Sequence, residues 1–254
     1  MAGSVIAAQL YTVRDFTKTP ADIIATMKKV AKAGYEAVQL SAVGPMDPKE
    51  LRKVCDGEGL KICATHIGYQ QMRDEPQAVI DLHATYGCPY AGIGGLPGEY
   101  RSAEGFAKFA KEASQVARRL AEAGLKFVYH NHSFELEKFG DRTGLQILYE
   151  DSDPAVFLSE IDTYWVQHGG GSPAAWLRKL KGRAPCVHLK DMTSKGGQQL
   201  MAEVGEGNLD WPDILAACRE AGAEWYIVEQ DTCQRDPFES LAISHRNLRA
   251  MGLS

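Results

Sequence analysis

The feature that most constrains the fold is a regular alternation between short β-rich runs and longer segments with helical periodicity. Runs rich in β-branched and aromatic residues recur along the whole chain, and each precedes a segment whose apolar residues recur at helical spacing. This alternation predicts repeated strand–helix units and a parallel sheet, because parallel strands need a crossover segment between them. The eight expected strands are residues 5–13, 36–42, 61–68, 89–95, 126–132, 156–162, 185–191 and 224–231.

The segments between these strands carry helix signals. Proline is favoured in the first helical turn, and it opens the expected helices at Pro20, Pro48 and Pro173. The clearest helical period lies at 102–124, and a further helix is expected at about 75–87. Two loops are also expected: a flexible one at 168–171, and a long one carrying VGEGNLDWP (204–212).

Two folds contain repeated strand–helix units, the closed (β/α)8 TIM barrel and the doubly wound open sheet. The chain has 254 residues, which is the usual length of an eight-unit barrel. An open sheet usually carries a glycine-rich turn after its first strand, but here that turn is QLYTVRDF (9–16). We therefore expect an α/β protein that is a single (β/α)8 barrel domain over residues 1–254.

Charge and composition narrow the function classes. The formal net charge is −5 and the pI is about 5.8, which argues against binding to nucleic acid or to an anionic membrane. Only Ala2, Gly3 and Ser4 separate Met1 from the first strand-like run, and no apolar stretch approaches 18 residues, so neither a signal peptide nor a membrane span is expected. The six cysteines show no CxxC pair and are expected to be reduced. A cytoplasmic protein is the expectation.

Polar side chains gather where the last four strands end. In a (β/α)8 barrel the active site lies at the C-terminal ends of the strands, so these residues are the candidate site. Alternate strand residues share one face, which gives a same-face pair two positions apart at the end of each of these strands, whereas Glu135 lies just past its strand. The residues are His130, His132, Glu135, Glu160, Asp162, His188, Lys190, Glu229 and Asp231. Carboxylates and imidazoles in this combination suit one divalent ion, with Mn²⁺ or Mg²⁺ favoured and Co²⁺ or Zn²⁺ also compatible.

Several short motifs carry a resemblance to a known family. They stand in order along nearly the whole chain: QLYTVR (9–14), YHNHSFEL (129–136), EIDTYWV (160–166), VHLKD (187–191), VGEGNLDW (204–211) and VEQD (228–231). This pattern resembles the sugar phosphate isomerase/epimerase family, whose members have a xylose-isomerase-like barrel. The resemblance is specific for the superfamily and does not name a substrate.

The resemblance implies a single divalent metal ion held by one residue from each of strands five to eight. It assigns three ligands to Asp162, His188 and Glu229. Many relatives have Glu at the position that His130 fills here, so the nearest carboxylate, Glu135, is the expected fourth ligand. His130 is the alternative ligand, and otherwise it or His132 is expected near the substrate.

Such a site suits isomerisation or epimerisation of a small sugar or a sugar-derived ketone. Removal of the proton next to a carbonyl builds negative charge on oxygen, and a divalent ion stabilises the enediolate that forms. The candidate bases are Glu135 and Glu229, with His130 and His132 as alternatives. Further substrate contacts are expected from Gln9, His66, Trp165, Lys190 and Glu206, although a core histidine, an ion pair or simple packing would also explain some of these residues.

Three other functions remain open. A dehydratase or lyase acting on a keto-inositol or an oxidised sugar would use the same metal site and expel a hydroxyl. A DNA-repair endonuclease on this barrel needs three zinc ions and many histidines, whereas the chain has seven in total. A sugar-binding barrel without catalysis would not need four metal ligands. The expected partner is a small sugar-like molecule, without nucleic acid or membrane, and a homodimer and a homotetramer both remain open.

Overall fold

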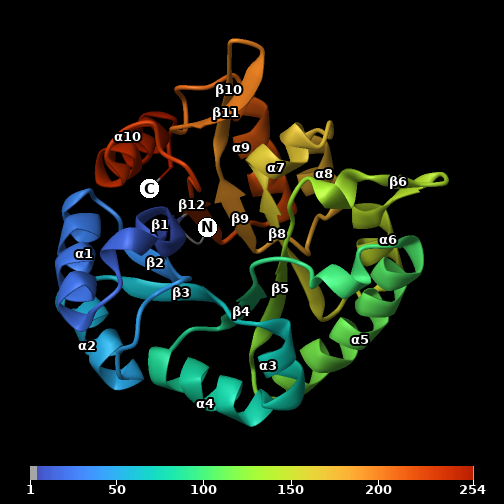
Figure 1. Ribbon diagram of the computed structural model, residues 1–254, viewed down its shortest axis with the longest axis horizontal. Helices are drawn as coiled ribbons and strands as arrows, with labels where there is room; N and C mark the ends of the chain where they lie inside the picture. Colours follow the sequence, from blue (N-terminus) through green and yellow to red (C-terminus); the bar gives the residue numbers. More distant parts are fainter. Residues whose placement is uncertain (1–4, 254) are drawn as a thin grey trace.

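A computed structural model describes residues 5–253, and its centre is a closed barrel of eight parallel strands (Figure 1). The expected (β/α)8 barrel is confirmed. Neighbouring strands follow one another around the barrel in chain order, and the first strand pairs with the last. The strands are β1 (Val5–Gln9), β2 (Ala37–Leu40), β3 (Lys61–His66), β4 (Tyr90–Ile93), β5 (Lys126–His130), β8 (Phe157–Asp162), β9 (Cys186–Leu189) and β12 (Trp225–Val228).

The helices surround this barrel and pack their apolar faces on it. Their N-termini follow local sequence signals: Thr19 and Asp22 form a capping box at the first helix, and prolines occupy first turns. The helices are α1 (Pro20–Lys32), α2 (Pro48–Gly57), α3 (Tyr69–Asp74), α4 (Pro76–Tyr86), α5 (Ala103–Glu122), α6 (Gly144–Asp151), α7 (Thr163–His168), α8 (Pro173–Lys179), α9 (Trp211–Ala221) and α10 (Pro237–Ala250).

A small apolar cluster fills the inside of the barrel beneath the strand ends. Most of its members are small, which suits the narrow interior of an eight-stranded barrel. The cluster contains Ala7, Ala37, Cys63, Ala64, Tyr90, Val128, Cys186 and Ile227. This core is separate from the larger layer between strands and helices, and it supports the polar residues above it.

Several elements differ from the expectation. The first strand ends at Gln9, because its side chain accepts a hydrogen bond from Tyr11 N and starts the 3-10 helix η1 (Leu10–Phe16). The segment after β3 forms two helices, α3 and α4, with Pro76 opening the second. The flexible loop expected at 168–171 is shorter, since His168 is the last residue of α7.

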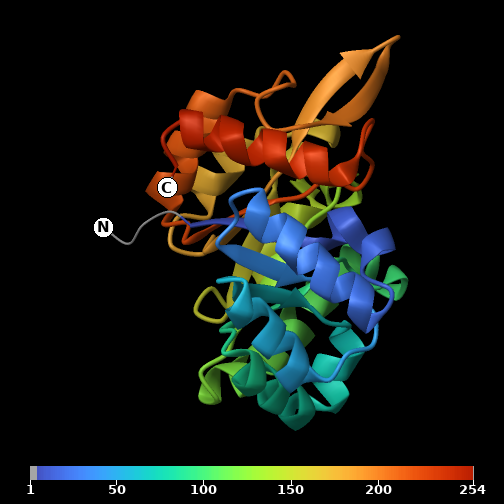
Figure 2. The ribbon, with the colours of Figure 1, turned by 90° about the vertical axis from the view of Figure 1, so that its left-hand side faces the viewer.

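The long loop expected after the seventh strand contains an antiparallel hairpin. It consists of β10 (Asp191–Lys195) and β11 (Gln198–Ala202), and it projects far beyond the barrel (Figure 2). Gly196 and Gly197 form its turn with φ angles of 59° and 79°, as a two-residue hairpin turn requires. A second short hairpin joins β6 (Lys138–Phe139) to β7 (Arg142–Thr143).

Within residues 5–253, no helix has both the length and the apolar character that are needed to cross a membrane.

Candidate metal centre

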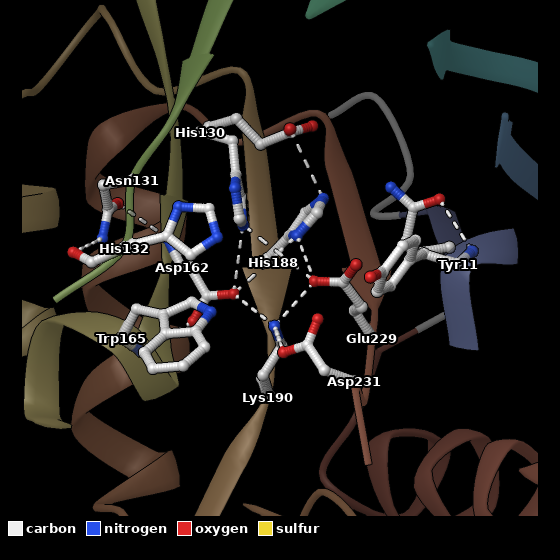
Figure 3. Close-up of polar contacts among 12 residues, drawn as sticks. Tyr11, His130, Asn131, His132, Asp162, Trp165, His188, Lys190, Glu229 and Asp231 are labelled. Carbon is white, nitrogen blue, oxygen red and sulfur yellow. Dashed lines mark hydrogen bonds and ion pairs between the residues drawn. The ribbon is translucent and has the colours of Figure 1, made fainter. Parts of the chain in front are cut away.

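Four side chains at the ends of β5, β8, β9 and β12 converge on one point (Figure 3). Strand pairing brings them together, because β5 aligns His130 with Glu160 and β8 aligns Asp162 with His188. The group consists of His130, Asp162, His188 and Glu229, all buried, and their potential ligand atoms lie within 4.8 Å of one another. Asp162, His188 and Glu229 were expected here from the sequence.

The distances identify the ligand atom that each residue offers. His188 Nδ1 lies 3.0 Å from Glu229 Oε2 and 3.8 Å from Asp162 Oδ2. His130 Nε2 lies 3.3 Å from Asp162 Oδ2 and 4.0 Å from Glu229 Oε2. The other oxygen of Asp162, Oδ1, accepts a hydrogen bond of 2.8 Å from Trp165 N at the start of α7. This N-terminal cap fixes the carboxylate so that Oδ2 faces the cluster.

Glu135, the expected fourth ligand, lies outside this group. It belongs to the 3-10 turn η3 (Phe134–Leu136), which folds back beside β5. Its carboxylate accepts hydrogen bonds from the Tyr129 hydroxyl (2.7 Å) and from His132 N (2.9 Å). Burial raises the pKa of Glu135 to about 7. The structure therefore brings His130 to the cluster and gives Glu135 a supporting place behind it.

The second nitrogen of His188 is held by buried amides. His188 Nε2 lies 2.6 Å from Gln39 Oε1, which also accepts a hydrogen bond from Gln9 Nε2 (2.7 Å). Gln39 Nε2 donates to Glu160 Oε1, so the amide oxygen faces the imidazole and must accept its proton. With Nε2 held in this way, Nδ1 is the nitrogen of His188 that faces Glu229 and Asp162 and would bind an ion in place of its proton, as in many metal sites with a supporting hydrogen bond.

Lys190 is a further cation in the cluster. Its ammonium lies 3.0 Å from Asp162 Oδ2, 2.7 Å from Glu229 Oε2 and 2.7 Å from Asp231 Oδ2, and the side chain is fully buried. It does not pair with Asp191, whose carboxylate faces Gly205 N, Gly207 N and Trp211 Nε1.

The charges at this site favour a bound cation. The site holds four carboxylates (Glu160, Asp162, Glu229 and Asp231) and one ammonium, that of Lys190, which leaves three negative charges uncompensated when the imidazoles are neutral. Burial favours neutral imidazole, but the attraction of Glu160 and Glu229 outweighs burial and raises the pKa of His188 to about 10. Two imidazole nitrogens and two carboxylate oxygens are a suitable donor set for one divalent ion. The residues present thus fit a metal ion.

A cavity of about 260 Å³ opens beside the cluster. Its lining consists of Tyr11, Ser41, His66, Gly94, His130, His132, Glu229 and Asp231. His66 Nε2 is paired with Glu160 Oε2 at 2.6 Å. A Cβ at Gly94 would lie 3.0 Å from His66 Nδ1, so glycine keeps that nitrogen accessible. A polar cavity therefore borders both the ligand cluster and a histidine–carboxylate pair.

Comparisons with known proteins identify the family of this chain. The family model described as xylose isomerase-like TIM barrel matches residues 27–251, which is most of the chain. The chain belongs to this family. Among curated proteins, it is 26% identical to the inosose dehydratase of Klebsiella pneumoniae, over 88% of each chain. It is 24% identical to the inosose dehydratase of Clostridium beijerinckii, over 84% of each chain.

The fold is also shared with a solved structure. A sugar phosphate isomerase/epimerase from Parabacteroides distasonis superposes with a TM-score of 0.81 at 20% identity, covering 97% of this chain and 98% of that one.

The remaining site residues that were expected in this xylose isomerase-like barrel lie at different distances from the cavity. His132 and His66 line the cavity, Trp165 packs 5.4 Å from the His132 ring, and Gln9 is buried beneath the cluster. Glu206 is exposed and bound by Asn247, away from the cavity lining.

From the sequence, Glu160 and Asp231 were placed in the candidate site without an individual role, and Gln39 was not identified. Gln39 also had a signal, because it is a polar residue inside an otherwise apolar strand, and Glu160 shares a strand face with Asp162.

Proposed function

We propose that this protein is a divalent-metal-dependent lyase that removes water from a small polyhydroxylated cyclic ketone of the inosose type. The convergence of His130, Asp162, His188 and Glu229 beside a polar cavity carries the proposal. Dehydration is favoured over isomerisation because the curated relatives reported above are inosose dehydratases.

His130 Nε2, Asp162 Oδ2, His188 Nδ1 and Glu229 Oε2 would hold the ion. When bound, the ion would polarise the substrate carbonyl and so make the neighbouring C–H bond more acidic. Mn²⁺ is our first choice, because the mixed nitrogen and oxygen donors suit it better than Mg²⁺, which prefers oxygen; Co²⁺ and Zn²⁺ are the alternatives.

His66 is the proposed proton carrier. Its Nε2 is fixed by Glu160, and its Nδ1 is directed to the cavity beside Gly94. Burial lowers the pKa of His66, although Glu160 partly offsets this, so the neutral ring is ready to accept a proton. Nδ1 takes the proton next to the carbonyl, and Glu160 stabilises the imidazolium. The same nitrogen then gives the proton to the departing hydroxyl, so that the C–H and C–O bonds break, a C=C bond forms and water leaves.

The cavity size supports a single ring as substrate. Its volume of about 260 Å³ is below the usual size of pockets for drug-sized ligands. Hydroxyl groups of a polyol have partners in Tyr11, His132 and Asp231, which line the cavity.

The test is incubation of the Mn²⁺-loaded protein with an inosose in deuterated water, followed by mass spectrometry. We expect a product that has lost one water, no product after chelation of the metal, and a loss of at least about 100-fold in kcat for His66→Gln. His83→Gln, a buried histidine that bonds Thr65 and Cys88, is the matched control. An inosose that is unchanged in the presence of Mn²⁺ would contradict the proposal.

The second candidate is isomerisation or epimerisation of a small ketose. The arrangement at His66 favours isomerisation within this class, because one proton carrier on one wall can return the proton to the neighbouring carbon, whereas epimerisation also needs a proton donor on the opposite face. Deuterium incorporation without loss of water would select this function.

A further inference from the structure

The ammonium of Lys190 lies on the same two oxygens that are proposed to hold the metal ion. Its Nζ is 3.0 Å from Asp162 Oδ2 and 2.7 Å from Glu229 Oε2. Asp162 Oδ2 and Glu229 Oε2 are also the oxygens nearest to His130 and His188. A divalent ion and this ammonium therefore compete for one pair of carboxylate oxygens.

Lys190 has a third partner outside the ligand group. Asp231 Oδ2 lies 2.7 Å from Nζ, and its side chain is about one quarter exposed and lines the cavity. The face of Trp165 borders the ammonium on another side, with its ring centroid 5.6 Å away. A buried ammonium needs a counter-charge, so Asp231 is the group that can hold Lys190 when Asp162 and Glu229 bind another cation.

We propose that Lys190 is a built-in counter-ion that replaces the divalent ion at Asp162 and Glu229 in the metal-free protein, and that Asp231 holds the ammonium when the ion binds. Lys190 keeps the two carboxylates together before loading and weakens ion binding by its own positive charge. The metal affinity is thus set by two residues that are not ligands. This inference rests on the metal site of the proposed function.

The first test compares Lys190→Met with the wild-type protein by calorimetric titration of the chelator-treated proteins with Mn²⁺. We expect the variant to bind Mn²⁺ at least about tenfold more tightly, because the competing charge is gone and the carboxylates repel each other in the metal-free form. The Tm of the metal-free variant should fall, whereas the Tm of the loaded variant should change much less. Lys179→Met, which breaks an exposed pair with Glu150, is the matched control and should leave the Kd unchanged.

The second test uses Asp231→Asn in two backgrounds. In the wild-type background we expect weaker Mn²⁺ binding, by at least about tenfold, because the displaced ammonium has lost its acceptor. In the Lys190→Met background the same substitution should change the Kd much less. An equal effect in both backgrounds would mean that Asp231 acts on the ion directly, and the inference would be wrong.

The outcomes also separate this inference from the proposed function. Unchanged or weaker Mn²⁺ binding by Lys190→Met, or an equal fall in the Tm of the metal-free and loaded forms, overturns the counter-ion role and leaves the metal site standing. A wild-type protein that binds no divalent ion overturns both.

Discussion

At the scale of single residues, the cluster depends on groups that do not touch the proposed ion. Gln39 joins His188 to Glu160 through both ends of its amide, with distances of 2.6 and 2.7 Å. Glu135 holds the backbone of His132 and the hydroxyl of Tyr129. Both residues orient others by hydrogen bonds, and both can be tested without an assay of activity.

Gln39→Leu removes the acceptor of the His188 Nε2 proton and leaves Glu160 without its amide donor. We expect Mn²⁺ affinity to fall by about 10- to 100-fold, as for other residues that support metal-binding histidines. Titration calorimetry measures the change. Gln77→Leu, which removes an exposed contact with Asp81, is the control and should have no effect on affinity. Wild-type affinity in Gln39→Leu would show that the amide does not orient the imidazole.

Glu135 should make stability depend on pH. Its pKa is about 7 when folded, compared with 4.5 for an unperturbed glutamate, so the folded protein holds the proton more tightly. Protonation of Glu135 therefore favours the folded form. This contribution to stability is complete below pH 4.5, and it is lost as the pH rises to about 7. The shift corresponds to about 3 kcal/mol of unfolding free energy.

Denaturant unfolding of the wild-type protein and of Glu135→Gln across this range tests the linkage. As the pH rises from 4.5 to about 7, the unfolding free energy of the wild-type protein should fall relative to that of the variant. A difference between the two that stays constant with pH would show that Glu135 titrates normally.

At the scale of elements, one buried carboxylate holds the segment after β9 in place. Asp191 accepts hydrogen bonds from Gly205 N, Gly207 N, Leu209 N and Trp211 Nε1 at 2.6 to 3.2 Å. A side chain at Gly207 would collide with this carboxylate. One aspartate thus ties the base of the β10–β11 hairpin to the start of α9.

Asp191→Asn should loosen this connection, because an amide offers one acceptor where several donors point at it. We expect a loss of about 3 kcal/mol in unfolding free energy and faster proteolysis between residues 191 and 210. Asp56→Asn, at an exposed pair with Arg52, is the control and should change stability by less than about 0.5 kcal/mol. Unchanged proteolysis would show that the loop is held by other contacts.

The strand–helix alternation was sufficient to predict the barrel, since each unit shows its pattern locally. It was not sufficient for the hairpin, because β10 is mostly polar and β11 begins with two glutamines, so neither is an apolar run like the barrel strands, and only Gly196-Gly197 marked their turn. In the site, Asp162, His188 and Glu229 were predictable from their positions at strand ends. The choice between His130 and Glu135 was not, because it depends on the turn that folds Glu135 back toward Tyr129.

At the scale of the whole molecule, metal binding should stabilise the barrel. An ion bound by residues of four strands favours the folded state by mass action, by about 2.7 kcal/mol when the free ion is at 100 times its Kd. For a chain of this length that corresponds to a rise in Tm of roughly 5 to 10 °C.

Thermal unfolding with Mn²⁺ and with a chelator measures this difference. Replacement of His188 by alanine should abolish it. A Tm that does not respond to Mn²⁺, Co²⁺, Zn²⁺ or Mg²⁺ would contradict the metal site.

The residues proposed to hold the ion and the residue proposed to carry the proton come from different halves of the chain. The four proposed ligands come from β5, β8, β9 and the end of β12, whereas His66, Gln9 and Gln39 come from β1 to β3. A change at His66 can therefore alter the proton chemistry while the four proposed ligands stay in place, whereas Gln39 ties the first strands to the ion through His188. This placement gives evolution a way to produce different proton chemistries from one inherited metal site, by changing the strand that carries His66.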